Sequence, residues 1–193
     1  MMKPVRLLVP QIVCSIVLTA ATVPAQETAL RIDPGRTKVE FTLGDLLHTV
    51  HGTFVMTRGT IRFDSATGKA SGELVVDAAS GASGSDGRDK RMHRNILESV
   101  VFPEIVFRPD RVDGKVALQG ASQVQLHGIF AIHGSEHEIT IPVAVDAADG
   151  QYNVNAHFFI PYVKWGLKNP STLMLRVSDK VELNIHTVAL TAR

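Results

Sequence analysis

Cysteine is nearly missing from this 193-residue chain, because Cys14 is the only one and it lies in an apolar N-terminal run. A short basic region precedes that run, and the small residues Val23 and Ala25 follow it at the spacing of a signal-peptidase site. We therefore predict a secretory signal peptide over residues 1–25. An uncleaved membrane anchor is the alternative, but Gln11 interrupts the run, which is at the short end of what spans a bilayer.

Cleavage after Ala25 leaves 168 residues without any cysteine, so disulfides cannot stabilise the mature protein. A chain of this length buries about two-thirds of the surface that its unfolded form exposes. No internal repeat, low-complexity linker or change in composition divides it. We therefore predict one domain over residues 26–193, held together by its hydrophobic core alone.

An excess of charge of either sign is also missing. Removal of Lys3 and Arg6 with the signal peptide lowers the 20 basic residues to 18, against 19 acidic ones, for a net charge of −1. A chain so close to neutral has no overall electrostatic attraction to nucleic acid or to an anionic membrane. Basic residues gather only locally, where a solvated helix face is favoured over a dedicated anion site; these residues are Arg88, Lys90, Arg91 and Arg94.

Signatures of catalytic and metal sites are absent as well. His48 and His51 form one close pair and His133 and His137 another, but neither spacing follows a known metal motif. Ser85 lacks the first glycine of a G-x-S-x-G nucleophile elbow. We expect no catalytic residue, no metal and no cofactor, and we do not expect an enzyme.

Alternation of apolar and polar residues is what the chain has in abundance. Short turns separate the alternating segments, which favours antiparallel strands over β-α-β units. An antiparallel sheet of about eight strands with one apolar face closes into a barrel that can hold one small ligand. The predicted strands are residues 37–43, 50–56, 60–64, 73–77, 112–118, 124–132, 138–145, 152–160 and 181–187, and Ile105 and Phe107 also alternate.

A helical period occurs only in residues 87–107. Met92, Ile96 and Val100 recur at i, i+4 and i+8 and predict one apolar stripe, with Asp86 as the N-cap. A single amphipathic helix in an all-β chain has no second helix to pack against. We therefore predict an all-β fold, a single antiparallel barrel with one amphipathic helix as a lid near a barrel end.

Phenylalanines occupy the inward-facing positions of the alternating segments. A closed barrel brings them together, either around a ligand cavity or as the filling of a packed interior, and the residues alone leave both open. These phenylalanines are Phe41, Phe63, Phe107, Phe130 and Phe158.

Residues 161–170 interrupt the strand pattern, since Pro161 cannot donate a hydrogen bond to a sheet. The segment is therefore expected to leave the sheet and cross a barrel end. There Tyr162, Trp165 and two lysines would meet the polar head of a ligand. A plain surface loop anchored by Trp165 is the equally supported alternative.

Short motifs follow one another along most of the chain: Ile32-Asp33-Pro34 ahead of Val39-Glu40-Phe41, Gly59-Thr60-Ile61 with Phe63-Asp64, Arg88-Asp89, Phe102-Pro103 with Ile105 and Phe107, and Ile132-His133-Gly134 ahead of Ile141-Pro142-Val143. In order and spacing, over roughly residues 30–188, they resemble the YceI-like family of exported, lipocalin-like barrels described as polyisoprenoid-binding. The resemblance implies a hollow barrel and an apolar ligand.

Two places depart from the family pattern. After Arg-Asp the family tends to have His-Leu, where this chain has Arg91 and Met92. Residues 160–183 are also unlike the short segment typical of the family. The first departure leaves open what a family histidine would contribute at the cavity mouth, and the second suggests a different mouth and with it a different ligand.

The leading hypothesis is a periplasmic or secreted carrier that encloses one long apolar molecule, such as a polyisoprenoid or a fatty amide, without transforming it. The alternatives are an enzyme that acts on a lipid-like substrate in the same barrel and a ligand-free stress or adhesion scaffold. We expect no nucleic acid partner and no membrane span after signal cleavage, and a homodimer stays open. The predicted ligand-binding residues are Phe41, Phe63, Met92, Ile96, Phe107, Phe130, Phe158, Tyr162 and Trp165.

Overall fold

The computed structural model describes residues 27–44, 49–172 and 176–192, and most of them lie in β-strands. None of the helices in these ranges is long and apolar enough to cross a membrane. In chain order the elements are β1 (Glu27–Ile32), the 3₁₀-helix η1 (Pro34–Arg36), β2 (Lys38–Gly44), β3 (Thr49–Asp64), β4 (Ala70–Ala82), α1 (Asp86–Arg91), the π-helix η2 (Met92–Ile96), β5 (Glu104–Asp113), β6 (Gly120–Ile132), β7 (Ser135–Ala148), β8 (Gln151–Ile160) and β9 (Val181–Thr191).

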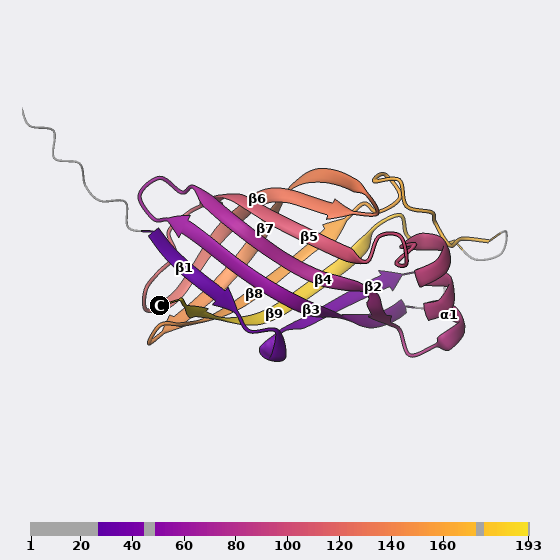
Figure 1. Cartoon of the computed structure of the whole chain (residues 1–193), viewed down its shortest axis with the longest axis horizontal. Coiled ribbons are helices and arrows are strands. Elements are labelled where there is room, and N and C mark those ends of the chain that lie inside the picture. The colour runs from indigo at the N-terminus through magenta and orange to yellow at the C-terminus, as the bar shows by residue number, and fades with distance from the viewer. Residues whose placement is uncertain (1–26, 45–48, 173–175, 193) are drawn as a thin grey trace, which may run out of the picture.

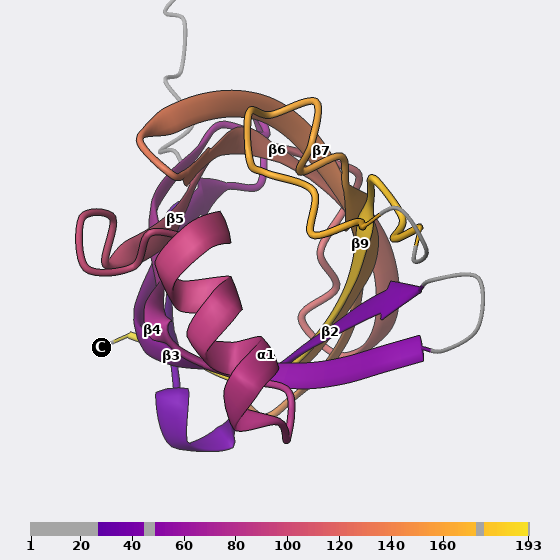
Figure 2. The same ribbon diagram turned by 90° about the vertical axis from the view of Figure 1, so that its right-hand side faces the viewer.

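The strands form a closed antiparallel barrel (Figures 1 and 2). Strands β2 to β9 pair around the ring in the order β2-β9-β8-β7-β6-β5-β4-β3, and β3 pairs with β2 to complete it. The extra strand β1 lies between β3 and β9, as β2 does. It pairs with those two strands nearer the other end of the barrel. The predicted fold, a single antiparallel barrel of about eight strands, is confirmed.

Strand β7 shows how alternation builds the wall. Ile141, Val143 and Val145 are buried and face the interior, while the residues between them are exposed. At its start, His133 and Gly134 connect β6 to β7 with φ values of 51° and 74°. Two successive left-handed residues are typical of a type I′ turn, whose twist matches that of the paired strands. The hairpin thus fixes which side chains of β7 face the interior.

Strand β3 is continuous where the sequence predicts two strands, residues 50–56 and 60–64. Its register with β4 shifts twice, the second time between Met56 and Arg58. A β-bulge inserts one residue, so the inward side passes from even positions such as Met56 to odd positions such as Phe63. The break in the period of two made one bulged strand resemble two strands.

One other strand prediction is wrong in part, and one strand was not predicted. Of the predicted strand 112–118, only the first two residues belong to β5, because Gly114 leaves the extended region with φ 109°. Leu118 is 67% exposed and lies in the loop before β6. The sequence also failed to indicate β1, where buried apolar positions are limited to Leu30 and Ile32.

The helical segment is shorter than predicted and changes type part-way. It begins after Ser85, one residue earlier than predicted, and passes from α1 into η2. The Leu97 N–H donates to the Met92 carbonyl oxygen at 2.9 Å, an i to i+5 bond that adds a residue to the turn. The predicted stripe is therefore wrong at Val100, which is 97% exposed, and Leu97 is buried in its place.

A substitution at a glycine of β4 tests how closely β4 and β3 are paired. Gly72 has φ 127°, and a methyl group there would overlap the Thr60 carbonyl oxygen of β3. We expect Gly72→Ala to lower the free energy of unfolding by about 2 kcal/mol or more. The matched variant Gly87→Ala, in α1 with open space around it, should raise it by about 0.5–1 kcal/mol. Urea midpoints at unchanged m-value measure both, and equal midpoints would contradict this account.

Candidate ligand-binding cavity

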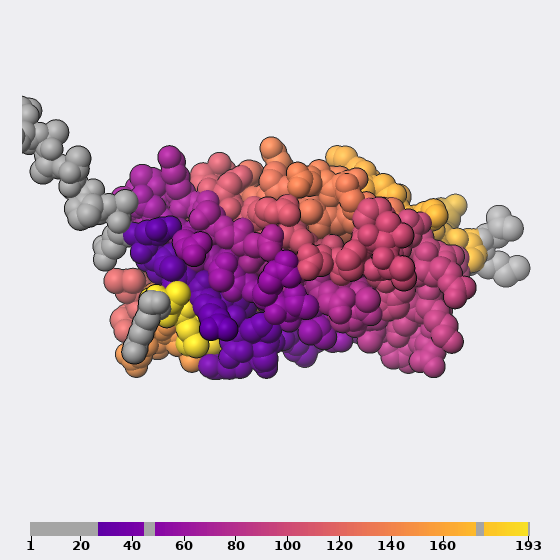
Figure 3. All heavy atoms as spheres, viewed as in Figure 1, coloured from indigo at the N-terminus to yellow at the C-terminus, as the bar shows by residue number. Residues whose placement is uncertain are grey.

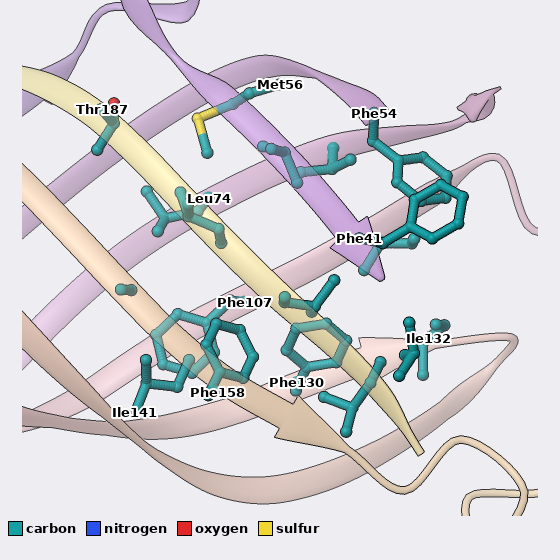
Figure 4. A pocket seen from close by; sticks show the side chains of 18 of the residues that line it. Phe41, Phe54, Met56, Leu74, Phe107, Phe130, Ile132, Ile141, Phe158 and Thr187 are labelled. Carbon is teal, nitrogen blue, oxygen red and sulfur yellow. The ribbon is translucent and has the colours of Figure 1, made fainter. Parts of the chain in front are cut away.

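The barrel encloses a cavity of about 620 Å³. This volume lies within the roughly 300–1,000 Å³ that is typical of small-molecule sites. All nine strands contribute inward side chains to its wall, and almost all of these are apolar (Figure 4). The alternating pattern of the sequence therefore produces an oily interior surface enclosed by a hydrogen-bonded ring.

Several inward side chains remain only partly buried. Leu74, Ala156 and Ile185 line the cavity and contact the buried core cluster, yet each keeps accessible surface. In an interior packed to the usual density, neighbouring side chains would cover that surface. The interior is therefore hollow, as the family resemblance implies.

The predicted phenylalanines lie together in this wall. Each lines the cavity and is only 6–7% exposed; they are Phe41, Phe63, Phe107, Phe130 and Phe158. Figure 4 shows Phe107, Phe130 and Phe158 directed into the same interior space. Of the other predicted residues, Met92 and Ile96 line the cavity from η2, and Tyr162 lines it from the segment after β8. Contact of these side chains with a ligand stays a prediction.

Trp165 lies outside the cavity wall. Its ring stacks on His137 of β7, with ring centroids 4.3 Å apart and an interplanar angle of 1°, and its centroid is 5.6 Å from that of Phe130. Trp165 therefore anchors the segment after β8 to the barrel. This agrees with the alternative of an anchoring tryptophan, and contact of Trp165 with a ligand stays a prediction.

Sequence reasoning missed part of the wall. Val50, Phe54 and Met56 line the cavity from β3, and the Phe54 ring lies 5.4 Å from that of Phe41. These three residues share alternate positions within the predicted strand 50–56, so alternation was a usable signal for them. The position of Leu74 in β4 carried the same signal.

Polar side chains line the cavity beside α1. The Ser83 N–H and hydroxyl donate to Asp89 Oδ1 at 2.9 and 2.5 Å, and Arg88 Nε donates to the Ser83 hydroxyl at 3.0 Å. The hydrogen bonds from Ser83 lower the pKa of Asp89 and keep its carboxylate ionised. Arg88 and Asp89 thus hold α1 to the loop before it. Arg91 also lines the cavity, and its side chain makes no hydrogen bond or ion pair with another described residue.

Tyr162 links the cavity to the segment before β9. Its hydroxyl donates to the Ser178 carbonyl oxygen at 2.7 Å, while its ring borders the cavity. Burial, and in addition the nearby Asp179, raise the pKa of Tyr162 to about 12. The phenol is therefore neutral and positions the chain by donating one hydrogen bond.

Two segments cover one end of the barrel (Figure 2). The helical segment of α1 and η2 crosses that end on one side, and residues 161–170 cross it on the other. From the first segment Met92 and Leu97 line the cavity, and from the second Leu167 and Pro170. Both segments therefore turn apolar side chains toward the cavity, as expected of a lid.

An acidic residue joins the two covering segments. The Glu98 carboxylate, just after η2, lies 3.2 Å from His133 Nε2 and 3.4 Å from Lys168 Nζ. His133 is in the β6–β7 turn, and Lys168 is in the second covering segment. His133, and then Lys168, lower the pKa of Glu98. We call these three residues the end clasp.

Histidines form no metal centre in the parts of the chain that the structure describes. His51 Nδ1 lies 3.1 Å from the Thr42 hydroxyl, and His133 and His137 make the contacts given above. His48 lies outside the described residues. Within those ranges, no three His, Cys, Asp or Glu side chains are grouped so that they could hold a metal ion.

Loss of the end clasp should loosen the cover at low pH. Because the folded-state pKa of Glu98 is lowered, its stabilising effect is complete above the ordinary value of 4.5 and is lost as pH falls through the folded value. We expect Glu98→Gln to release a bound apolar fluorophore several-fold faster at neutral pH and to remove much of the acceleration seen on acidification. Stopped-flow dilution measures the release. Glu136→Gln, which removes an outer-face ion pair to Arg108, is the control, and an equal effect there would contradict the clasp.

The chain was compared with known proteins and with solved structures. None of the curated proteins compared with the chain matches it. Among solved structures, BcnA of Burkholderia cenocepacia is 17% identical with a TM-score of 0.67, over 81% of this chain and 98% of its own. A polyisoprenoid-binding domain from Saccharophagus degradans is 15% identical with a TM-score of 0.63, over 86% and 99% respectively. The YCEI protein of Campylobacter jejuni is 16% identical with a TM-score of 0.63, over 76% and 88%.

At such identities these structures are similar to the chain in fold. The family is decided by the sequence itself, because the model of the YceI-like domain matches residues 30–189, which is most of the chain and the whole of the barrel apart from its first and last few residues. This chain therefore belongs to the family of YceI-like domains.

Proposed function

We propose that this protein is a carrier that encloses one long apolar molecule, such as a polyisoprenoid or a fatty amide, without transforming it. The observation that supports the proposal is the cavity of about 620 Å³, whose wall is almost wholly apolar. A wall of this kind offers few directed polar contacts and a large area for hydrocarbon. The similar domain from Saccharophagus degradans is described as polyisoprenoid-binding, which is the same class of ligand.

Burial of hydrocarbon supplies the affinity that such a carrier needs. Each buried methylene group contributes about 0.8 kcal/mol, so a chain of about 20 carbons gains roughly 16 kcal/mol. That gain offsets the roughly 4–15 kcal/mol lost with the freedom of the ligand. The length and shape of the ligand's hydrocarbon chain would then decide which molecules the carrier binds.

We further propose that the carrier works in the periplasm or outside the cell. The support is the signal-peptide pattern of residues 1–25 and the cysteine-free remainder. A molecule with a long hydrocarbon chain is nearly insoluble in an aqueous compartment. A barrel that hides the chain would let it cross that compartment.

Binding is better supported than turnover. Ser83, the serine that lines the cavity, bonds to Asp89 and Arg88, and no histidine is placed to act as its base among the described residues. A nucleophilic serine needs such a base within hydrogen-bond reach. The scaffold alternative would be supported by a filled interior, and the hollow barrel counts against it.

The purified protein should carry a passenger. A protein made beside membranes should take up hydrocarbon into its apolar cavity, because water in such a cavity finds few groups to which it can hydrogen-bond. Native mass spectrometry followed by organic extraction should show one bound species per barrel, with the mass of a long alkyl or prenyl molecule. Recovery of the same molecule unchanged after long incubation would favour carriage over catalysis.

A cavity-filling variant gives the matched control. Ala156→Phe adds a ring inside the cavity, whereas Ala144→Phe adds the same ring on the exposed face of β7. We expect the first variant to lose the passenger and the second to keep it, with both still folded by circular dichroism. A wild-type protein that is ligand-free and takes up no apolar probe would overturn the carrier proposal.

Arg91 should bias the carrier toward an anionic head group. It is a cation at the edge of an apolar wall and has no partner among the described residues. We expect Arg91→Gln to weaken binding of a long-chain fatty acid about tenfold while leaving the matching alcohol unchanged. Lys115→Gln, in the loop after β5, is the control, and fluorescence competition measures both. Equal losses for acid and alcohol would contradict a role in head-group recognition.

A further inference from the structure

Two adjacent valines stand out on the surface of the barrel. Val100 is 97% exposed and Val101 is 69% exposed, and both lie in the loop between η2 and β5. Other exposed apolar side chains, such as Leu118 and Phe159, are single residues far apart in the sequence, which is ordinary for a protein surface. We call Val100 and Val101 the valine tip.

The valine tip is held in place by its own loop. Glu98 adopts φ 47°, and its carbonyl oxygen accepts from the N–H groups of Val101 at 2.8 Å and Phe102 at 3.0 Å. The residues on either side of the tip are directed inward, since Ser99 is 5% exposed and the Phe102 ring packs 4.7 Å from that of His133. A fixed turn with anchored flanks therefore presents two stiff β-branched side chains to solvent.

Basic side chains surround the valine tip. Lys90, His93 and Arg94 share a shallow surface depression with the two valines. His93 is held inward, with Nε2 at 2.8 Å from the Gly81 carbonyl oxygen, whereas Lys90 and Arg94 are exposed and make no ion pair with a described residue. The acidic residue of this depression, Glu98, is already paired in the end clasp.

An apolar tip among unpaired cations matches the surface of an anionic bilayer. Valine side chains can insert among the lipid head groups, and each lysine or arginine near the surface adds electrostatic attraction. The sequence favours a solvated helix face for these cations, but that reading leaves the exposed valines without explanation.

We propose that the valine tip, with Lys90 and Arg94, docks the barrel on a bilayer that contains anionic phospholipid. The loop after η2, which carries the tip, projects to one side beside α1 at the covered end of the barrel (Figures 1, 2 and 3). From the same helical segment Met92 and Ile96 line the cavity. Docking therefore brings the lid close to the bilayer, which shortens the path of a ligand between the bilayer and the cavity. This route rests on the proposed carrier function, whereas the docking itself does not.

Vesicle co-sedimentation of the mature protein tests the docking. We expect binding to phosphatidylcholine vesicles that contain about one-third phosphatidylglycerol, and little binding to phosphatidylcholine alone. Binding should weaken as salt rises from about 0.15 M to about 1 M, because the Debye length falls from about 8 Å to about 3 Å. Equal binding to both vesicle types, or no binding to either, would overturn the proposal.

Variants distinguish vesicle binding by the valine tip from non-specific binding. Val100→Asp with Val101→Asp should reduce vesicle binding more than tenfold, and Lys90→Gln and Arg94→Gln should each reduce it roughly fivefold. Leu118→Asp and Lys115→Gln remove the same kinds of side chain from the β5–β6 loop and should bind as the wild type does. Equal loss in these control variants would overturn the proposal. So would a dimer in solution that the double valine variant abolishes, because a second copy would then be the partner.

Ligand measurements keep this proposal distinct from the carrier function. The double valine variant should take up a fluorescent fatty acid from detergent as the wild type does, but should extract it from anionic vesicles at least tenfold more slowly. If no variant or wild type takes up ligand while vesicle binding still depends on the valine tip, the docking stands and the carrier proposal fails. Extraction at the wild-type rate despite lost vesicle binding would overturn the role of docking in ligand transfer.

Discussion

The hydrogen-bonded pairing of β3 with β4 is the constraint on which the rest of this molecule depends. It joins the first and last parts of the strand order, so a sheet that would otherwise have two open edges becomes a ring. Once the ring is closed, backbone groups are satisfied within the wall and the interior need not be filled to keep the strands together. A hollow apolar cavity, covered at one end by α1 and η2, is the consequence.

The bulges in β3 also explain which inward-facing residues the sequence predicted correctly and which it did not. Alternation identified the inward positions of β7 and the wall phenylalanines, because each lies in a stretch where the period of two is locally unbroken. It failed where one residue is inserted. In β3 the inserted residue moves the inward side from Met56 to Phe63. In η2 the π-turn buries Leu97 in place of Val100. The pattern shows a break at such an insertion but not that one element continues across it, so the fold could be predicted but not every inward residue.

The covered end of the barrel was the least predictable part, because its contacts join residues far apart in the sequence. Glu98 meets Lys168, which lies 70 residues away, and Trp165 stacks on His137 of β7. None of these side chains belongs to a periodic pattern. The sequence suggested that Trp165 and Lys168 meet a ligand's polar head, whereas in the structure they hold the second covering segment to the rest of the barrel. The same residues can therefore control access to the cavity without touching what it contains.

Because the interior is hollow, the wall of the barrel contributes a larger part of the stability of the fold. Val75 is 0% exposed, yet it does not line the cavity; it lies opposite Arg58 on the outer face, beside the ion pairs of that arginine with Glu73 and Glu104. Exposed ion pairs contribute little each, so the buried valine and the strand pairing matter more there. The empty centre is then the place where stability can still be gained. A molecule that filled it would bind the folded chain alone and stabilise it by mass action, so the proposed carriage would be coupled to folding.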